Sequence, residues 1–495
     1  MGIPGYFAGV LRRCRASVHE TFPPAAAVRL LCLDYNCLVH RCVTEGVNGA
    51  EDSDGIVVVR AALEYLEALL ARVPPATEVF VAADGVPPVA KMAQQRLRRF
   101  VSAAARVPGA PPVGFERNKI TPGTDFMRLL DAETHAFCAA RSIAYSGSDE
   151  PGEGEQKIVA RLRQRDGKDE AGGLDVIYGL DADLIVLSVA LGAEGRPMPW
   201  LCREQGDPGI NDALWFVDTS EIARGLAARA GAAAQPMTAF VNHVVVSFLC
   251  GNDFLPPLAF VDVRGEWPAA LLRLATEGGQ PLRRDPGGAV DWAELLRLLE
   301  ALAEAEDVEM RRADAAFWRS REDPADPREP RDRAIRPATP GWRARYYGRL
   351  FDVMDASEIH DIAVEYAVGL QWTLDYYGGL TGAGGAWPLW RYRHSHSPTA
   401  RDLCNVVRFH GDQLTAMARA RPSVAVLPWQ LLTAVMPRAD LHLVPPEGRP
   451  YVTDPRLGMS HAYPTSCARA SYLRRRAHER VPLLPPMRVP GLPAF

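Results

Sequence analysis

The stretch Val176-Ile177-Tyr178-Gly179-Leu180-Asp181-Ala182-Asp183 decides the fold class of this chain. A short apolar run is typical of a buried strand, and this one delivers two carboxylates at its carboxyl end. Apolar residues resume at Leu184, so both Asp side chains lie between hydrophobic segments. Burial of a carboxylate is costly unless it meets a cation or a hydrogen-bond donor. The pattern therefore predicts a strand of an α/β sheet that ends in a functional site, because such sheets bind ligands beyond the carboxyl ends of their strands.

Five further acidic residues follow apolar runs or lie in a glycine-rich turn. They are Asp34 after residues 30–33, Asp84 after residues 79–83, Glu153 and Glu155 in the turn 151–155, and Asp253 after residues 244–252. We expect the runs to be strands whose carboxyl ends meet at one edge of a sheet. Seven carboxylates gathered there would repel one another unless cations lay between them. Because oxygen-rich clusters suit Mg²⁺ or Mn²⁺, the sequence predicts a two-metal phosphodiesterase site.

Each acidic segment also has a purely structural explanation. Asp34 would serve as the N-cap of a helix, and the pair Glu153 and Glu155 as the acidic first turn of one. Asp253 lies beside Asn252, a composition typical of a turn. The occurrence of all these segments in one chain favours a shared metal site over several unrelated structural roles.

A basic helix is expected shortly after the turn at Asp84. Its polar face is formed by four residues spaced i, i+4, i+7 and i+8, namely Lys91, Gln95, Arg98 and Arg99. A cluster of cations with an amide is what a terminal phosphate dianion requires, and arginine supplies paired donors. A solvated basic helix is the structural alternative. The nearby acidic segments favour phosphate binding.

Three aromatic side chains are candidate platforms for nucleobases. His40 lies on the helix expected after Asp34, and Trp387 and Trp390 belong to a short aromatic group. Stacking on such rings tolerates any base and suits single-stranded nucleic acid. Each ring alone is more often part of a hydrophobic core, so this interpretation depends on the rest of the site.

The composition is that of an ordinary globular protein. Hydrophobic residues make up 47% and charged residues 23% of the 495 residues, and the net charge is −4. Any contact with nucleic acid must therefore come from a local basic surface. Nine scattered cysteines without a CxxC pair argue against structural zinc and disulfides, and predict an intracellular location in cytoplasm or nucleus. With no apolar run of about 18 residues and no leader, we expect no membrane span.

Three segments are expected along the chain. Residues 1–320 alternate apolar runs with helical stretches, the pattern of a mostly parallel α/β sheet flanked by helices. Residues 321–340 are rich in Arg, Asp and Pro, which predicts a solvated linker. Residues 341–495 regain aromatic and apolar content and end in a Pro-rich stretch. They predict a second region, largely helical and irregular, that wraps around the sheet.

Taken in order, these segments resemble the XRN family of 5′→3′ exoribonucleases over nearly the whole chain. In the first region the likeness is carried by residues 1–7, 84–99, 121–127, 151–157, 179–187 and 251–256. In the second region it is carried by residues 341–351, 366–377, 387–398 and 427–486. The chain departs from the family at residues 391–396 and 473–476, where basic sequences replace aromatic or polar ones.

The resemblance implies a PIN-like nuclease fold and a role for each candidate residue. It implies two Mg²⁺ or Mn²⁺ ions held by seven catalytic carboxylates, namely Asp34, Asp84, Glu153, Glu155, Asp181, Asp183 and Asp253. The implied ligands of a 5′-monophosphate are Lys91, Gln95, Arg98 and Arg99, and the implied base clamp is His40 with Trp387 or Trp390. The implied substrate is single-stranded RNA, which a monomer shortens to 5′-mononucleotides. We expect the chain to be a compact catalytic core. Its source would be either a virus, in which case it acts in the host cell, or a divergent lineage.

Two other functions stay open at this point. A structure-specific flap nuclease acting on DNA shares the acidic strand ends, although the second region argues against it. A catalytically weak RNA-binding protein would keep the basic and aromatic residues, although the presence of all seven carboxylates argues against it. Metal-dependent release of mononucleotides from RNA distinguishes these functions.

Overall fold

The computed structural model describes most of the chain, from Phe7 to Leu492. The described residues are 7, 9, 14–23, 27–44, 55–73, 76–104, 106, 115–165, 173–205, 213–230, 236–284, 288–323, 327–382, 385–454, 456, 459–476 and 479–492. The opening segment that contributes to the family likeness lies outside these residues except for Phe7. In the described part of the chain, no helix is long and apolar enough to cross a membrane.

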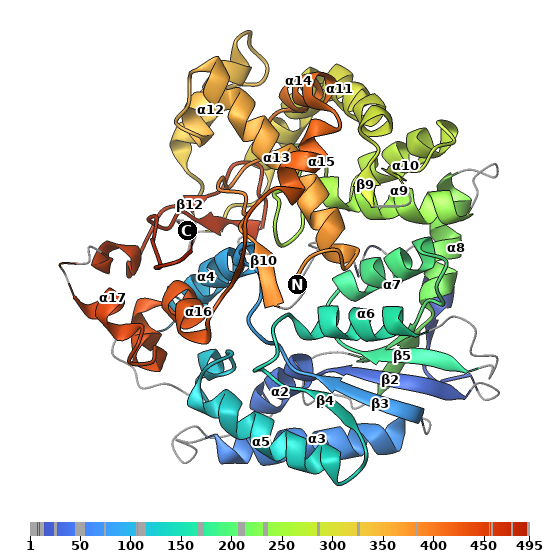
Figure 1. The fold of residues 1–495 in the computed structure, drawn as a ribbon. Helices are drawn as coiled ribbons and strands as arrows, with labels where there is room; N and C mark the ends of the chain where they lie inside the picture. The colour runs from blue at the N-terminus through green and yellow to red at the C-terminus, as the bar shows by residue number, and fades with distance from the viewer. Residues whose placement is uncertain are drawn as a thin grey trace.

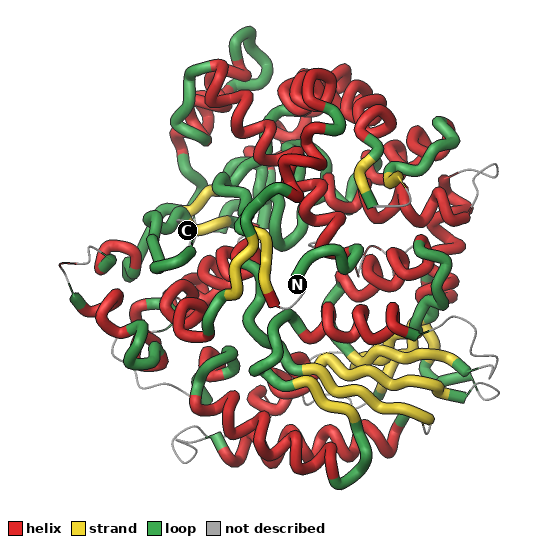
Figure 2. The backbone as a smooth tube through the Cα atoms, viewed as in Figure 1, coloured by secondary structure: helices red, strands yellow, loops and turns green. Residues whose placement is uncertain are grey.

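A seven-stranded sheet forms the centre of the first region (Figure 2). Its strands are β1 Val18–His19, β2 Val28–Asp34, β3 Ala76–Ala82, β4 Ala144–Ser146, β5 Leu174–Tyr178, β6 Trp200–Glu204 and β7 Leu214–Val217. They lie in the order β1-β7-β6-β5-β2-β3-β4. The neighbours from β4 to β6 pair in parallel, whereas β7 is antiparallel to both β6 and β1. The mostly parallel sheet predicted from the sequence is confirmed.

Helices cover both faces of this sheet (Figure 1). The helices of this part of the chain are α2 Tyr35–Thr44, α3 Ile56–Arg72, α4 Val89–Ala104, η2 Arg117–Lys119, α5 Asp125–Ala139, α6 Gly154–Gln164, α7 Asp183–Ala193, α8 Thr219–Ala230, α9 Pro236–Leu249 and α10 Trp267–Glu277, with η1 Arg15–Ser17 at the start. In β2, Leu31 and Leu33 pack with α2, α3 and α5, while Leu30 and Cys32 pack with α6 and α7. Successive strand residues point to opposite faces, so a strand buried on both sides is apolar throughout.

One expected strand is a helix. The run at residues 244–252 predicts a strand, but residues 244–249 belong to α9, so Asp253 follows a helix. That prediction is wrong because every side chain of residues 244–249 is buried. A helix buried all round carries no polar stripe, and periodicity alone cannot distinguish it from a strand.

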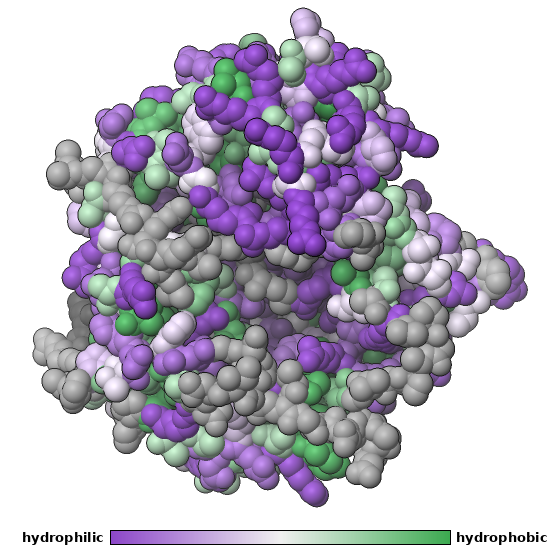
Figure 3. All heavy atoms as spheres, turned by 180° about the vertical axis from the view of Figure 1, so that it is seen from behind, coloured by the Kyte–Doolittle hydropathy of each residue, from purple (hydrophilic) through white to green (hydrophobic). Residues whose placement is uncertain are grey.

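The second region consists of helices, irregular segments and short two-stranded sheets, as predicted (Figure 1). From residue 292 on, the helices are α11 Trp292–Arg319, η3 Pro330–Ile335, α12 Trp342–Leu350, α13 Ala356–Tyr377, α14 Ala400–His410, α15 Gln413–Arg419, α16 Pro428–Val435, η5 Arg438–Leu443, α17 Arg449–Thr453 and η7 Ser460–Ala462. The short strands outside the central sheet are β8 Arg283–Arg284, β9 Ala289–Val290, β10 Ala386–Pro388, β11 Ser423–Ala425, β12 Arg469–Ala470 and β13 Val481–Pro482. Seen from behind, the surface is mostly hydrophilic, with apolar residues in small scattered groups (Figure 3).

The described part of segment 321–340 is folded and is not a solvated linker. Arg328 and Asp332 are only 5% and 3% exposed. The Arg328 guanidinium lies 4.7 Å from the centre of the Phe317 ring, and the Asp332 carboxylate accepts a hydrogen bond from Arg349 at 2.8 Å. The composition misleads because two of its charged side chains, Arg328 and Asp332, are buried and paired within the fold, although most of the others are exposed.

Helix α4 joins the two regions and lies next to α16 (Figure 1). Its Val89 and Met92 belong to the hydrophobic cluster that contains the apolar side chains of α16. The Arg96 guanidinium donates to the carbonyl oxygens of Ala462 and Pro485 at 2.8 and 2.9 Å. The predicted phosphate-binding helix is therefore also a structural element of the second region.

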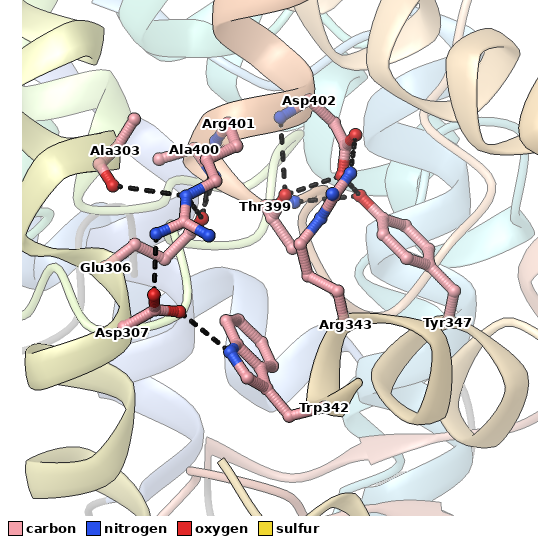
Figure 4. A network of polar contacts seen from close by, with 10 residues as sticks. All are labelled: Ala303, Glu306, Asp307, Trp342, Arg343, Tyr347, Thr399, Ala400, Arg401 and Asp402. Atoms are coloured by element: carbon pink, nitrogen blue, oxygen red, sulfur yellow. Dashed lines mark hydrogen bonds and ion pairs between the residues drawn. The ribbon is translucent and has the colours of Figure 1, made fainter. Parts of the chain in front are cut away.

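A buried carboxylate fixes the start of α14 against α11 (Figure 4). Glu306, which is 1% exposed, accepts the backbone N–H groups of Ala400 and Arg401 at 2.6 and 3.4 Å. Burial raises the pKa of Glu306 to about 7, although these two hydrogen bonds oppose the shift. The adjacent Asp307 accepts from the Trp342 indole and the Arg401 guanidinium, both at 2.8 Å. These contacts tie α11, α12 and α14 together.

Asp402, in the first turn of α14, makes further contacts between α14 and α12 (Figure 4). Its carboxylate accepts from the Tyr347 hydroxyl at 2.6 Å and from the Thr399 hydroxyl at 2.5 Å, and pairs with Arg343. Each oxygen therefore has a donor, as buried polar groups require.

Glu306→Ala is expected to lower the free energy of unfolding by about 2 kcal/mol, because it leaves two buried N–H groups without an acceptor. Glu306→Gln keeps an acceptor oxygen and should lose less. Denaturant unfolding followed by circular dichroism measures both. Equal stability of Glu306→Ala and the wild type would contradict this role.

The same residue predicts a pH dependence. Because the pKa of Glu306 is raised in the folded state, the fold binds its proton more tightly than the unfolded chain between pH 4.5 and about 7. The stability that this proton contributes is lost as the pH rises through that window. Replacement by glutamine removes this component. The difference in stability between wild type and Glu306→Gln should therefore change between pH 5 and pH 7.5, and a constant difference would argue against the shift.

Candidate metal and phosphate site

The carboxyl edge of the sheet is the place where most of the predicted site residues meet. Asp34 is the last residue of β2, while Asp84 and Asp181 lie just beyond the ends of the neighbouring strands β3 and β5. A cavity of about 760 Å³ opens at this edge. The predicted residues in its wall are Asp34, His40, Asp84, Lys91, Gln95, Arg98, Arg99, Glu153, Glu155 and Asp181.

Tight backbone contacts place these carboxylates. The Gly154 N–H at the start of α6 donates to Oδ1 of Asp84 at 2.7 Å, and the Asp84 N–H donates to Oδ1 of Asn36 at 3.0 Å. A Cβ atom on Gly154 would lie 2.8 Å from the carbonyl oxygen of Ala82, so this turn requires glycine. The ends of β2, β3 and α6 are thereby held together.

Two groups of side chains have the spacing of metal ligands. Asp34, Cys37 and Asp181 form one group, and Glu155, Asp181 and Asp183 form the other, with ligand atoms within 4.8 Å of one another in each. Burial, together with Asp34 and Asp181, raises the pKa of the Cys37 thiol, which donates to Asp34 at 2.8 Å. Cys37 is thus a hydrogen-bond donor, and Asp181 is the carboxylate common to both groups.

The carboxylates repel one another in the absence of a cation. Burial raises the pKa of Asp34 to about 8, with further contributions from Asp84 and Asp181. Burial, followed by Asp181 and Asp253, raises the pKa of Asp183 to about 7. Asp183 is 3% exposed, and its Oδ1 has no hydrogen-bond partner among the described residues. A divalent cation would satisfy this oxygen, so the residues fit a metal ion.

Lys91 balances part of the negative charge. Its Nζ lies 2.5 Å from Oε1 of Glu153 and 2.8 Å from Oδ2 of Asp253. Burial alone lowers the pKa of Lys91, but the carboxylates, led by Asp253 and Glu153, raise it well above its usual value. The Tyr376 hydroxyl donates to the second oxygen of Glu153. Asp253 is thus joined to the acidic cluster through a cation.

Another wall of the cavity is basic. Gln95, Arg98 and Arg99 lie along α4, and Arg117 faces the same cavity from η2. Burial, followed by the neighbouring Arg98, lowers the pKa of Arg99 to about 9. Cations that repel one another in a partly dry cavity are stabilised by an anionic ligand, and guanidinium groups bind phosphate with paired hydrogen bonds.

The candidate stacking residues lie in different surroundings. His40 lines the cavity, and burial, followed by Arg98, lowers its pKa to about 4, so the ring is neutral at neutral pH. Trp387 and Trp390 are 5% and 2% exposed, and in the described part of the chain neither belongs to the cavity wall. The Trp387 ring packs 5.9 Å from that of Tyr376. Base stacking by either tryptophan stays a prediction.

The sequence interpretation does not include several residues that line the cavity. They are Phe7, Asn36, Cys37, Arg41, Ser102, Arg117, Asn118, Ile120, Leu180, Arg203, Glu204, Gln205 and Trp215. Arg203 has a signal in the sequence, because it is the first charge after the apolar run Trp200-Leu201-Cys202. Arg117 has no comparable signal, since it belongs to a short 3₁₀ turn whose place in space depends on the tertiary fold.

Comparison with known families gives two matches that cover most of the chain. The family described as "XRN 5'-3' exonuclease N-terminus" matches residues 1–195, and the one described as "Xrn1 helical domain" matches residues 291–488. The chain belongs to the XRN family. The first XRN match ends just after α7 and includes every predicted metal ligand except Asp253. The second begins at the N-cap of α11, ahead of the boundary at 341 expected from the sequence.

Individual XRN relatives are similar over different lengths. The 5'-3' exoribonuclease 2 of Gallus gallus is 24% identical over 98% of this chain and 68% of its own length. The 5'-3' exoribonuclease 1 of Saccharomyces cerevisiae is 31% identical over 49% of this chain and 18% of its own, and that of Homo sapiens is 33% identical over 38% and 12%. The aligned part thus spans less than a fifth of the latter two proteins. XRN nucleases depend on a metal, and the two acidic groups are a place for it.

Mg²⁺ is expected to stabilise the wild-type protein against heat. A cation that binds the folded acidic cluster shifts the unfolding equilibrium by mass action. Thermal melts with a chelator and with millimolar Mg²⁺ measure the shift, and the Asp181→Ala, Asp183→Ala double variant should show none.

Without metal, Asp183→Asn should raise Tm by at least about 2 °C, because it removes buried like-charge repulsion. A lower Tm for Asp183→Asn in chelator would contradict the repulsion.

Proposed function

We propose that this protein is a 5′→3′ exoribonuclease that degrades single-stranded RNA with a 5′-monophosphate to 5′-mononucleotides. One observation carries the proposal: a single cavity is acidic at the edge of the sheet and basic along α4. A cation site beside a phosphate site suits a substrate whose terminal phosphate lies one nucleotide from the bond that is cut. The names of the relatives, 5'-3' exoribonucleases 1 and 2, support the same activity.

We assign the metal to the seven carboxylates and propose two Mg²⁺ or Mn²⁺ ions. The residues proposed to hold or surround them are Asp34, Asp84, Glu153, Glu155, Asp181, Asp183 and Asp253. Bound there, such ions would activate water and stabilise negative charge on the scissile phosphate and its leaving oxygen. Asp181 would contribute to both proposed ion sites, because it belongs to both groups.

The basic residues are proposed to hold the 5′-phosphate. Gln95, Arg98 and Arg99 with Arg117 offer donors from two sides of the cavity, and Lys91 lies between them and the carboxylates. Such contacts fix the position of the strand without reading its sequence. Donors arranged for one phosphate leave the added charge of a triphosphate, or of a cap, without partners, which disfavours both ends.

The neutral His40 ring is proposed to stack on a base, with Trp387 or Trp390 as its partner. Such a role for either tryptophan requires a rearrangement of its buried aromatic cluster when RNA binds.

We propose that the protein acts as a monomer inside the cell, in the cytoplasm or the nucleus, or in the host cell if its source is a virus. No disulfide joins any of the nine cysteines, all of which lie in the described part of the chain. That state supports a reducing compartment. The nuclease domain is proposed to span residues 1–320. The second region, from residue 341, completes this domain by packing against its helix α4.

The end specificity tests the proposal directly. With Mg²⁺, RNAs of one sequence that carry a 5′-monophosphate, 5′-hydroxyl or 5′-triphosphate are incubated with the protein, and released mononucleotides are separated by chromatography. We expect rapid release from the monophosphate RNA alone. The Asp181→Ala, Asp183→Ala double variant should lose at least about 10³-fold in rate, since it removes ligands of both proposed ions.

The other outcomes identify the alternatives. Cleavage of branched DNA without mononucleotide release from RNA would indicate a flap nuclease. RNA binding without release from any 5′ end would indicate a binding protein and overturn the proposal.

Arg98→Gln should weaken discrimination between 5′ ends. Loss of a charge-assisted hydrogen bond to phosphate is expected to lower kcat/KM on 5′-monophosphate RNA by about tenfold or more, and far less on 5′-hydroxyl RNA. The ratio of the two rates is the measurement, and Arg128→Gln on the exposed face of α5 is the matched control. An equal loss on both substrates would mean that Arg98 does not bind the terminal phosphate.

A further inference from the structure

The cavity extends beyond the acidic cluster to two more strands. Arg203 on β6 and Trp215 on β7 line its wall together with Phe7. These side chains belong neither to the seven carboxylates nor to the basic face of α4. This end of the cavity therefore needs its own explanation.

The sheet gives this end a defined position. Along the edge the strands follow the order β3, β2, β5, β6 and β7. Helix α4 follows β3, the carboxylates Asp34 and Asp181 lie at β2 and β5, and Arg203 and Trp215 come next. Phosphate site, metal site and the Arg203 end thus succeed one another along one cavity. A strand held at its 5′ end on α4 and cut at the carboxylates would continue toward β6 and β7.

Arg203 and Trp215 lie side by side on neighbouring strands. They are direct partners in the antiparallel register of β6 and β7, so their side chains lie on the same face of the sheet. Trp215 is only partly buried, so part of its ring is accessible. A cation beside an accessible indole combines a phosphate ligand with a stacking surface, the arrangement that binds single-stranded nucleic acid without sequence preference.

Among the described residues no carboxylate lies within ion-pair distance of the Arg203 guanidinium, although the more distant charges of Glu204 and Asp181 act on it. In the described part of the chain it forms no ion pair, its Nε is buried without a hydrogen-bond partner, and its only ring contact is Phe7 at 3.7 Å. The adjacent Glu204 is engaged elsewhere, since it accepts from the Tyr65 and Tyr178 hydroxyls and lies 3.7 Å from Arg41. A guanidinium in a cavity wall that has no ion-pair partner among the described residues is suited to an anionic ligand.

We propose that Arg203 and Trp215 form a subsite for the nucleotide on the 3′ side of the scissile phosphate. Trp215 stacks on its base, and Arg203 binds the phosphate that follows it. The subsite rests on the proposed exoribonuclease activity and extends it, because it would hold the remaining strand in place while each mononucleotide leaves. It also predicts that the enzyme prefers RNA that reaches beyond two nucleotides.

Paired changes in protein and substrate test the subsite. Arg203→Gln should lower kcat/KM about tenfold on a 5′-phosphorylated decamer, chiefly through KM, and much less on a 5′-phosphorylated dinucleotide that has no phosphate to reach Arg203. A decamer with an uncharged methylphosphonate at the linkage after the second nucleotide should show the same loss, and the two losses should not add. Trp215→Leu and an abasic second nucleotide form the equivalent pair.

Controls separate this result from folding and from the proposed activity. Arg311→Gln, at an exposed arginine of α11, is the matched control, and thermal melts check that each variant is folded. RNA affinity is also measured in the Asp181→Ala, Asp183→Ala background, where no cleavage is needed. If the wild type releases no mononucleotide but Arg203→Gln weakens RNA binding in that background, the proposed activity fails, whereas the assignment of Arg203 as a contact to single-stranded RNA is supported. Equal losses on dinucleotide and decamer, or additive losses, would overturn the subsite.

Discussion

Buried negative charge at the edge of the sheet is the constraint on which the rest of the structure depends. Strands β2, β3 and β5 deliver carboxylates to one small volume, where burial and mutual repulsion raise the pKa of Asp34 and Asp183. The fold tolerates this because Lys91 lies between Glu153 and Asp253 and because donors such as the Gly154 N–H point inward. We infer that stability is sacrificed locally for the proposed cation and phosphate sites.

The second region is needed for the same reason. Lys91 is fixed because α4 is fixed, and α4 is clamped by side chains and carbonyl groups from the far end of the chain. Tyr376 on α13 reaches Glu153 directly. The helical region therefore acts as the support of the site, and not as a separate module attached by a linker. The compact, charge-paired segment between α11 and α12 agrees with that function.

Much of this arrangement could be predicted from the sequence, and the failures have physical causes. Parallel strands ending in Asp34, Asp84 and Asp181 were predictable because strand period and the position of the site are local rules. Residues 244–249 misled because a fully buried helix has no polar stripe. The pairing of Arg203 with Trp215 could not be predicted from the sequence, because it depends on the register of two strands and not on spacing along the chain. Burial of Trp387 depends likewise on tertiary packing.

The contacts of α4 have a consequence for how the protein is made. Arg96 is bound by carbonyl groups that lie 366 and 389 residues further along the chain. Contacts of such long range form late, because closing a large loop costs entropy before any contact repays it. During translation the acidic strands emerge early, but the contacts that fix α4 form only after Pro485 has left the ribosome. A nascent chain that has not yet reached these residues lacks the contacts that hold the basic face of α4 in place.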